Sequence, residues 1–264
     1  MHARSAVVDL YGDHLSRRDW WAPVSAVVAL AECVDVHAPT TRTAISRLVA
    51  QGWLRAEGRE GVRGYAASGR AQERWRHAHE RVYAAGPGPW GGDWHVVQLD
   101  AVGERRRRDQ VASTLGYLGY GRYRGGGWIS PWRSPELAPS LDALGVRWLS
   151  VHGKVEGPSD PSQLAASVWD LDRLAGAYTD FLAGLPDDSP ALGPREAYAR
   201  RTHLVHAWRR FLFQDPGLPL EVLPPDWVGH RARARFLALA ADLAPATEVF
   251  VDQALAGRLA DHER

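Results

Sequence analysis

Residues Pro39–Leu54, PTTRTAISRLVAQGWL, constrain the fold of this chain more than any other stretch. Plotted at about 100° per residue, they separate into an apolar side and a side of arginine and hydroxyl residues, as in a half-exposed helix. Thr40 is the expected N-cap, and Gly52 is the expected left-handed residue that ends the helix before a strand begins. The apolar side contains Ala44, Ile45, Leu48 and Val49, and the polar side contains Arg42, Thr43, Ser46 and Arg47.

The elements around this helix predict a winged helix-turn-helix. Apolar residues at helical spacing indicate two earlier helices, over residues 3–15 and 24–33. After the helix, the segments WLRAE (53–57) and VRGYA (62–66) flank Gly58–Gly61, which predicts a β-hairpin with a glycine-bounded turn. In a winged helix the third helix enters the major groove of DNA and the hairpin lies beside it.

The positive charge of the chain is concentrated in the same region. The formal net charge is only +1, which excludes a uniformly basic surface. Between residues 39 and 81, however, nine arginines accompany four glutamates. We therefore predict binding to double-stranded DNA, with the helix facing the bases and the hairpin facing phosphates. The predicted DNA-binding residues are Thr41, Arg42, Thr43, Ser46, Arg47, Arg55, Arg59 and Arg63, of which Thr41 is turned toward the apolar side.

Two other interpretations of this region stay open. The polar helix face and the hairpin are also compatible with a solvated surface, or with a winged helix that serves only as a protein-interaction scaffold. Residues 68–83 continue as an arginine-rich helix after an N-cap at Ser68, and we expect this helix to connect to the next domain. A steep salt dependence of DNA binding would distinguish a DNA-binding unit from a scaffold.

A second domain is expected after a linker at Ala84–Asp93, AAGPGPWGGD, whose glycines and prolines disfavour helix and strand. The pattern that follows is strand 94–100, helix 104–118, strands around 120–123 and 127–130, helix 135–144 and strand 146–155. This βαββαβ order predicts a ferredoxin-like domain. The fold class is therefore α+β, with a winged helix at 1–84, a ferredoxin-like middle domain at 85–158 and a helical domain at 159–264.

The helical domain supplies a candidate site for a small-molecule effector. Helices are expected over 161–185, 194–213, 231–243 and 248–259, with a proline-rich connection at 215–227. Arginines beside aromatic residues suit a ligand that has both apolar groups and phosphates. The alternative is that these arginines pair with carboxylates such as Asp215 and Glu221. The candidate effector-binding residues are His203, His206, Trp208, Arg209 and Arg210.

An enzyme is the rival class. A metal-dependent nuclease could use Asp100, which ends the first strand of the middle domain, as a metal ligand, but a metal site normally needs several ligands and no partner lies nearby in sequence. We therefore predict no catalytic site, no metal and no cofactor. The single Cys33, the lack of a signal-peptide pattern and the lack of a long apolar run predict a cytoplasmic protein without a membrane span.

Three stretches together resemble the PaaX type of transcriptional repressor of phenylacetate catabolism. They are TRTAISRLVAQGWL (41–54), WDLDRLAGAYTDFL (169–182) and LVHAWRRFLFQDPGLPLEVLPPDWVGHRAR (204–233), and the resemblance extends over nearly the whole chain. It implies a homodimeric repressor that is released from its DNA operator by a ligand, which is phenylacetyl-coenzyme A in the founding members. It also implies a middle domain that is similar to a small CRISPR-associated endoribonuclease and supplies dimer contacts.

Overall fold

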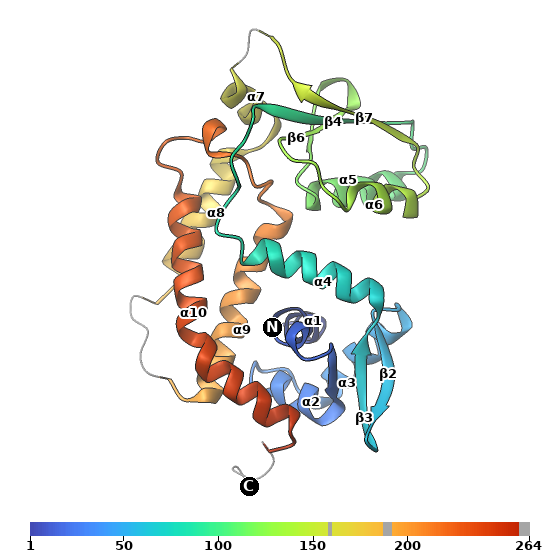
Figure 1. Ribbon diagram of the computed structural model, residues 1–264, viewed down its shortest axis with the longest axis vertical. Helices are drawn as coiled ribbons and strands as arrows, with labels where there is room; N and C mark the ends of the chain where they lie inside the picture. The colour runs from blue at the N-terminus through green and yellow to red at the C-terminus, as the bar shows by residue number, and fades with distance from the viewer. Residues whose placement is uncertain (158–159, 187–191, 259–264) are drawn as a thin grey trace. The chain divides into compact units, whose positions relative to one another are not determined.

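The computed structural model describes residues 1–157, 160–186 and 192–258 (Figure 1). The chain divides into two compact units. The first contains Met1–Ala84, Leu185–Arg209 and Ala234–Arg264, and the second contains Ala85–Gly184 and Arg210–Arg233. The helices expected to form a separate domain at 159–264 are thus shared between the two units.

The first unit begins with helices around a small sheet. Its four N-terminal helices are α1 (Ala3–Asp13), α2 (Val24–Glu32), α3 (Ala38–Ala50) and α4 (Gly69–Val82). Its strands are β1 (Trp21–Pro23), β2 (Leu54–Arg59) and β3 (Val62–Ala67), which pair antiparallel in the order β1-β3-β2. The turn between β2 and β3 has positive φ angles at both Glu60, 49°, and Gly61, 81°, as a two-residue type I′ turn requires. The predicted hairpin is therefore present, and β1 is an additional strand.

The core of the first unit is built around α1, which packs against α2, α3, α4 and α9 (Pro194–Trp208) (Figure 1). Val7, Leu10 and Tyr11 lie at helical spacing and are each at most 2% exposed. They share one apolar cluster with Ile45 of α3 and Phe250 of α10 (Val228–Leu255). Burying each such side chain stabilises the folded state by roughly 1.5 to 3 kcal/mol. Because the apolar side of α3 is buried in this cluster, its polar side faces outward.

The second unit contains the predicted βαββαβ sequence of elements. These are β4 (Asp93–Leu99), α5 (Arg105–Tyr117), β5 (Gly121–Arg122), β6 (Trp128–Ser130), α6 (Leu137–Ala143) and β7 (Trp148–Lys154). The sheet order is β5-β6-β4-β7, and every pair is antiparallel. This is the ferredoxin-like arrangement, with α5 and α6 covering one face (Figure 1).

The two sheet faces have separate apolar clusters. On the α5 and α6 side, Val97 packs with Leu115 and Leu141. On the other side, Trp94 and Ile129 pack with residues of α7 (Pro161–Val168) and of the 3-10 turn Leu220–Val222. Successive side chains of β4 point to opposite faces of the sheet and so contribute to both apolar clusters, as expected for a strand covered on both faces.

Three expected helix boundaries are wrong. The helix expected over 161–185 is two helices, α7 and α8 (Leu171–Ala183), because Trp169 is extended and Asp170 caps α8 by accepting from the Arg173 amide at 2.9 Å. The two helices expected over 231–243 and 248–259 are the single α10, which continues through Pro245. The N-cap of α3 is His37 and not Thr40, which lies inside the first turn.

Candidate functional site

The polar side of α3 is exposed, as the sequence predicts. Arg42, Thr43, Ser46 and Arg47 are exposed, whereas Ala44, Ile45 and Leu48 are buried. The Thr43 hydroxyl donates to the Pro39 carbonyl and the Ser46 hydroxyl to the Arg42 carbonyl, both at 3.0 Å. Each hydroxyl oxygen keeps acceptor capacity. The face therefore combines two arginines with two groups that can accept hydrogen bonds.

Thr41 does not belong to this face. It is 0% exposed, and its hydroxyl lies 3.3 Å from the Val36 carbonyl and 3.2 Å from the His37 carbonyl, to which it can donate. A buried hydroxyl satisfied in this way stabilises the start of the helix. Its inclusion among the predicted DNA contacts is therefore corrected, because no part of the side chain reaches the surface.

The hairpin arginines share one carboxylate. Arg55 and Arg59 both pair with Glu57, and the hydrogen bond from Arg59, at 2.7 Å, is the main cause of the lowered pKa of Glu57. Arg59 also lies over the Trp21 ring, 5.0 Å from its centroid. Arg63 is exposed on β3 and carries no ion pair among the described residues. Glu57 therefore offsets part of the positive charge of Arg55 and Arg59 but not that of Arg63.

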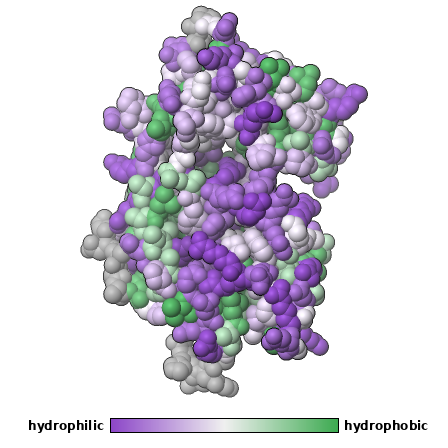
Figure 2. All heavy atoms as spheres, viewed as in Figure 1, coloured by the Kyte–Doolittle hydropathy of each residue, from purple (hydrophilic) through white to green (hydrophobic). Residues whose placement is uncertain are grey.

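The hydrophilic surface extends onto α4. Ser68 caps this helix by accepting from the Ala71 amide at 3.3 Å, as predicted, and donates to the Gly52 carbonyl after α3 at 2.8 Å. Arg70 lies over the Trp53 ring, 4.9 Å from its centroid. Figure 2 shows hydrophilic residues gathered over α4 on the visible face. The end of α3 and the start of α4 are thus joined by side-chain contacts.

The candidate effector residues of the α9 region contact other parts of the protein. His206 Nδ1 lies 2.8 Å from Asp9 of α1, and Arg209 also pairs with Asp9, which is 4% exposed. Trp208 is 3% exposed, and its indole donates to the Val82 carbonyl at 3.2 Å. The expected alternative, pairing of these arginines with carboxylates, is correct in kind for Arg209, but the carboxylate is Asp9.

The two remaining residues of this candidate set, His203 and Arg210, are exposed. His203 faces solvent on α9. Arg210 donates to the Ala177 carbonyl at 3.1 Å within the second unit. Asp215, expected as a partner of these arginines, pairs with Arg233 at 3.6 Å and accepts from Tyr178 at 2.5 Å. Four of the five residues thus have contacts within the protein, and His203 is exposed.

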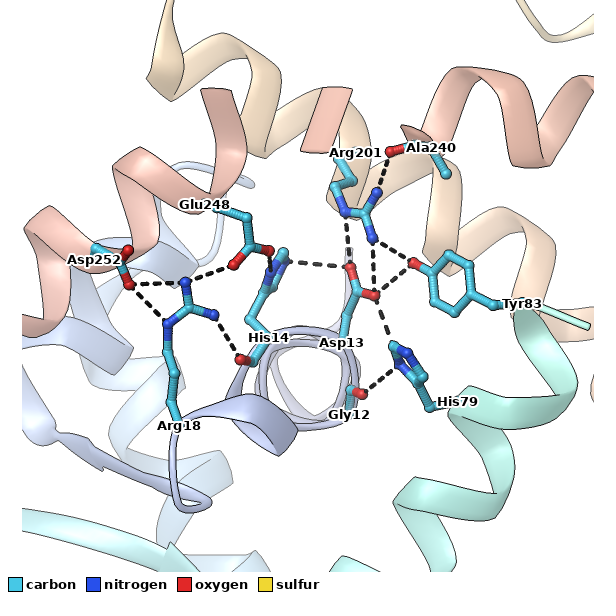
Figure 3. A network of polar contacts seen from close by, with 10 residues as sticks. All are labelled: Gly12, Asp13, His14, Arg18, His79, Tyr83, Arg201, Ala240, Glu248 and Asp252. Carbon is cyan, nitrogen blue, oxygen red and sulfur yellow. Dashed lines mark hydrogen bonds and ion pairs between the residues drawn. The ribbon is translucent and has the colours of Figure 1, made fainter. Parts of the chain in front are cut away.

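A largely buried polar network lies in the first unit (Figure 3). The side chain of Asp13, at the end of α1, is 4% exposed and pairs with Arg201 of α9 at 3.1 Å. The Tyr83 hydroxyl donates to Asp13 at 2.5 Å, and His79 of α4 lies 3.9 Å from the same carboxylate. Arg201 further donates to the Ala240 carbonyl of α10. The network thus joins α1, α4, α9 and α10 within the first unit.

Burial and ion pairing shift the pKa values of several groups in this network. Burial alone would raise the pKa of Asp13, but His14 and Arg201 outweigh it and lower that pKa. Hydrogen bonding from His14 and Arg18 lowers the pKa of Glu248 to about 2, although partial burial opposes it. Burial lowers the pKa of His79 despite the nearby Asp13. The network is therefore set up for ionised carboxylates and a neutral His79.

The sequence contained a signal for this network. Asp9 and Asp13 are four residues apart on a helix that is otherwise mostly apolar, so both fall on one side of it. Carboxylates on a buried side need cationic partners. The partners, Arg209 and Arg201, are about 200 and 188 residues away, so their identity could not be deduced from spacing.

The residue considered for a nuclease, Asp100, lies on the surface. It pairs with Arg147 at 2.8 Å, and the two side chains are 57% and 89% exposed. Among the residues that the structure describes, no group of three or more His, Cys, Asp or Glu side chains is arranged to hold a metal ion. Over the same residues, no helix is both long and apolar enough to cross a membrane.

Three family models match consecutive segments of the chain. The PaaX-like protein model matches residues 2–71, the PaaX protein central Cas2-like domain matches residues 87–165, and the PaaX-like protein C-terminal domain matches residues 169–253. A similar protein is the transcriptional repressor PaaX of Escherichia coli (strain K12), 28% identical over 94% of this chain and 83% of that protein. A similar solved structure is the uncharacterized protein Rv0674 from Mycobacterium tuberculosis, 26% identical, which matches with a TM-score of 0.59 over 95% of this chain and 98% of that one.

Proposed function

Because this chain belongs to the PaaX family, we propose that it is a transcriptional repressor that binds a DNA operator through a winged helix-turn-helix. In this proposal α1, α2 and α3 are the helices, β2 and β3 form the wing, and α3 is the recognition helix. The repressor named among its relatives supports the functional class. The protein acts as a regulator and not as an enzyme.

One observation carries the assignment of α3. Its buried side, formed by Ala44, Ile45 and Leu48, is anchored in the core of the first unit, and its exposed side holds Arg42, Thr43, Ser46 and Arg47. A recognition helix needs this combination, because a rigid scaffold must present hydrogen-bonding groups to base edges. Arg63 on the wing supplies a cation for the phosphate backbone.

Fluorescence anisotropy with duplexes from the protein's own upstream region tests the assignment. Arg47→Ala is expected to weaken binding to the preferred duplex by about 10- to 100-fold and to reduce discrimination against changed bases, as loss of a base contact costs about 1 to 3 kcal/mol. Affinity should also fall steeply with salt. Arg200→Ala, at an exposed arginine of α9, is the matched control and should bind as the unmodified protein does. Equal loss in both variants, or no sequence-selective complex at all, would refute the proposal.

We further propose that the protein is a homodimer and that an acyl-coenzyme A of the aryl-acetyl class releases it from DNA. A two-fold dimer presents two recognition helices to an inverted repeat. The exposed apolar residues of β7 support a dimer contact in the second unit, since Leu149 is 61% and Val151 64% exposed. The effector acts by binding more tightly to the form of the dimer that has low affinity for DNA.

A further inference from the structure

The second unit contains an open cavity of about 660 Å³ outside all the sites predicted from the sequence. It is formed by side chains from the first half of α5 and from the short strands β5 and β6. Cavities of about 300 to 1,000 Å³ are typical of small-molecule sites. The lining residues are Arg105, Arg108, Asp109, Ala112, Arg122 and Trp128.

Three arginines give the cavity a positive charge. Among the described lining residues Asp109 alone is acidic, and its contact with Arg105 is long, at 4.0 Å. The two side chains are 75% and 89% exposed, so solvent screens their attraction and the pair is weak. The carboxylate therefore leaves most of the cationic character of the cavity in place.

Two of these arginines are oriented by contacts that do not neutralise them. Arg108 Nη1 donates to the Gly103 carbonyl at 2.8 Å. The Arg122 guanidinium lies over the Trp128 ring, 5.5 Å from its centroid, and Trp128 is 7% exposed in the core of this unit. Held guanidinium groups match the oxygen geometry of a phosphate and can bind it through paired N–H donors.

We propose that this cavity binds the phosphate groups of a small organic ligand of the coenzyme A type. This inference rests on the proposed function, in which an effector releases the protein from DNA. It places the part of the effector site that binds phosphate at α5 and β5. Of the two arginines that the sequence suggested for this role, Arg209 pairs with the buried carboxylate of Asp9, and Arg210 donates to the Ala177 carbonyl at 3.1 Å. The cavity is open to solvent, so the phosphates of a small ligand can reach its arginines.

Isothermal titration calorimetry with coenzyme A tests the cavity directly. Pantetheine, which lacks the phosphates, is the negative probe and should not bind measurably. The variant Arg108→Gln/Arg122→Gln is expected to weaken coenzyme A binding by about 10-fold or more, because two charged donors to phosphate are removed. The control is Arg106→Gln, because Arg106 lies on the same helix but does not line the cavity. This variant should bind coenzyme A as the unmodified protein does. Thermal melts establish that both variants are folded.

The outcomes separate this proposal from the proposed function. Equal affinity of the double variant and the Arg106→Gln control for coenzyme A would overturn it, as would failure of the unmodified protein to distinguish coenzyme A from pantetheine. Loss of affinity for every DNA duplex in the double variant would show a nucleic-acid contact and would also overturn it. If the unmodified protein binds coenzyme A through these arginines but no DNA selectively, the proposed function fails while the cavity assignment stands.

Discussion

Gly64 in β3 occupies a position where a side chain does not fit. A Cβ atom there would lie 2.5 Å from the Ala22 carbonyl oxygen and 2.6 Å from the Trp21 ring. Both neighbours belong to β1, and the Trp21 indole donates to the Glu57 carbonyl of β2 at 3.0 Å. Gly64→Ala is therefore expected to separate β1 from β3 and to lower the free energy of unfolding of the first unit by about 1 to 3 kcal/mol.

The matched control for this substitution is Gly58→Ala on β2. There a Cβ would meet only the Val62 carbonyl, at 3.7 Å, which is an ordinary van der Waals distance. Urea unfolding followed by tryptophan fluorescence compares the two variants, and Gly58→Ala should stay close to the unmodified protein. Similar midpoints for the two would show that β1 adjusts to a methyl group without loss.

Residue-level predictions from the sequence succeeded where the partners are local. The exposure of Arg42, Thr43, Ser46 and Arg47 follows from helical periodicity alone, and the Ser68 cap from its own neighbours. The partner of His206 and Arg209 could not be predicted, because Asp9 lies on α1, about 200 residues earlier. A charge next to aromatic residues has the same sequence pattern in a ligand site and in a buried ion pair, so only the tertiary contact distinguishes them.

At the scale of elements, prediction was accurate for the parts with strong periodicity and turn residues. The order of elements from α1 to β7 was recovered, except for β1, whose Trp21–Pro23 is too short to show alternation. The errors lie in the C-terminal helices. The break expected between residues 243 and 248 contains Pro245, but buried residues on both sides of it, including Leu243 and Phe250, keep α10 continuous. Their burial outweighs the single backbone hydrogen bond that proline removes.

The edge strand β7 allows a test of the proposed homodimer. Leu149 and Val151 are two residues apart, so they point to the same face of the sheet, and both are more than 60% exposed. If this face forms the proposed dimer contact, Leu149→Glu/Val151→Glu introduces two carboxylates that repel their counterparts across the two-fold axis. Sedimentation velocity should then show a monomer at concentrations where the unmodified protein is a dimer.

Val249→Glu on α10 is the control for this experiment, because Val249 is an exposed apolar residue, at 50%, in the first unit. It should leave the dimer intact. A dimer that persists in the β7 double variant would place the subunit contact elsewhere. Dissociation of both variants would indicate a general effect of added charge.

At the scale of the whole molecule, each unit contains a histidine whose pKa is lowered. Burial is the main cause of the lowered pKa of His79 in the first unit, and Arg17 and Arg201 add to it while Asp13 opposes. Burial, Arg133 and His152 lower the pKa of His95 in the second unit. A depressed histidine pKa means that the folded state binds fewer protons than the unfolded state below the ordinary value of 6.5. Their contribution to stability is therefore present above pH 6.5 and is lost as the pH falls.

Hydrogen exchange at pH 7.5 and 5.5, corrected for intrinsic rates, resolves this loss unit by unit. Opening free energies should fall at the lower pH for α4, which carries His79, and for β4, which carries His95. His79→Gln should remove the pH dependence of α4 and leave that of β4, whereas His77→Gln on the same helix should retain both. Glu248 does not contribute in this window, because its pKa is lowered from 4.5 to about 2 and its effect begins only below pH 4.5. If α4 still loses protection at pH 5.5 in His79→Gln, the acid sensitivity of the first unit has another origin than the Asp13 network.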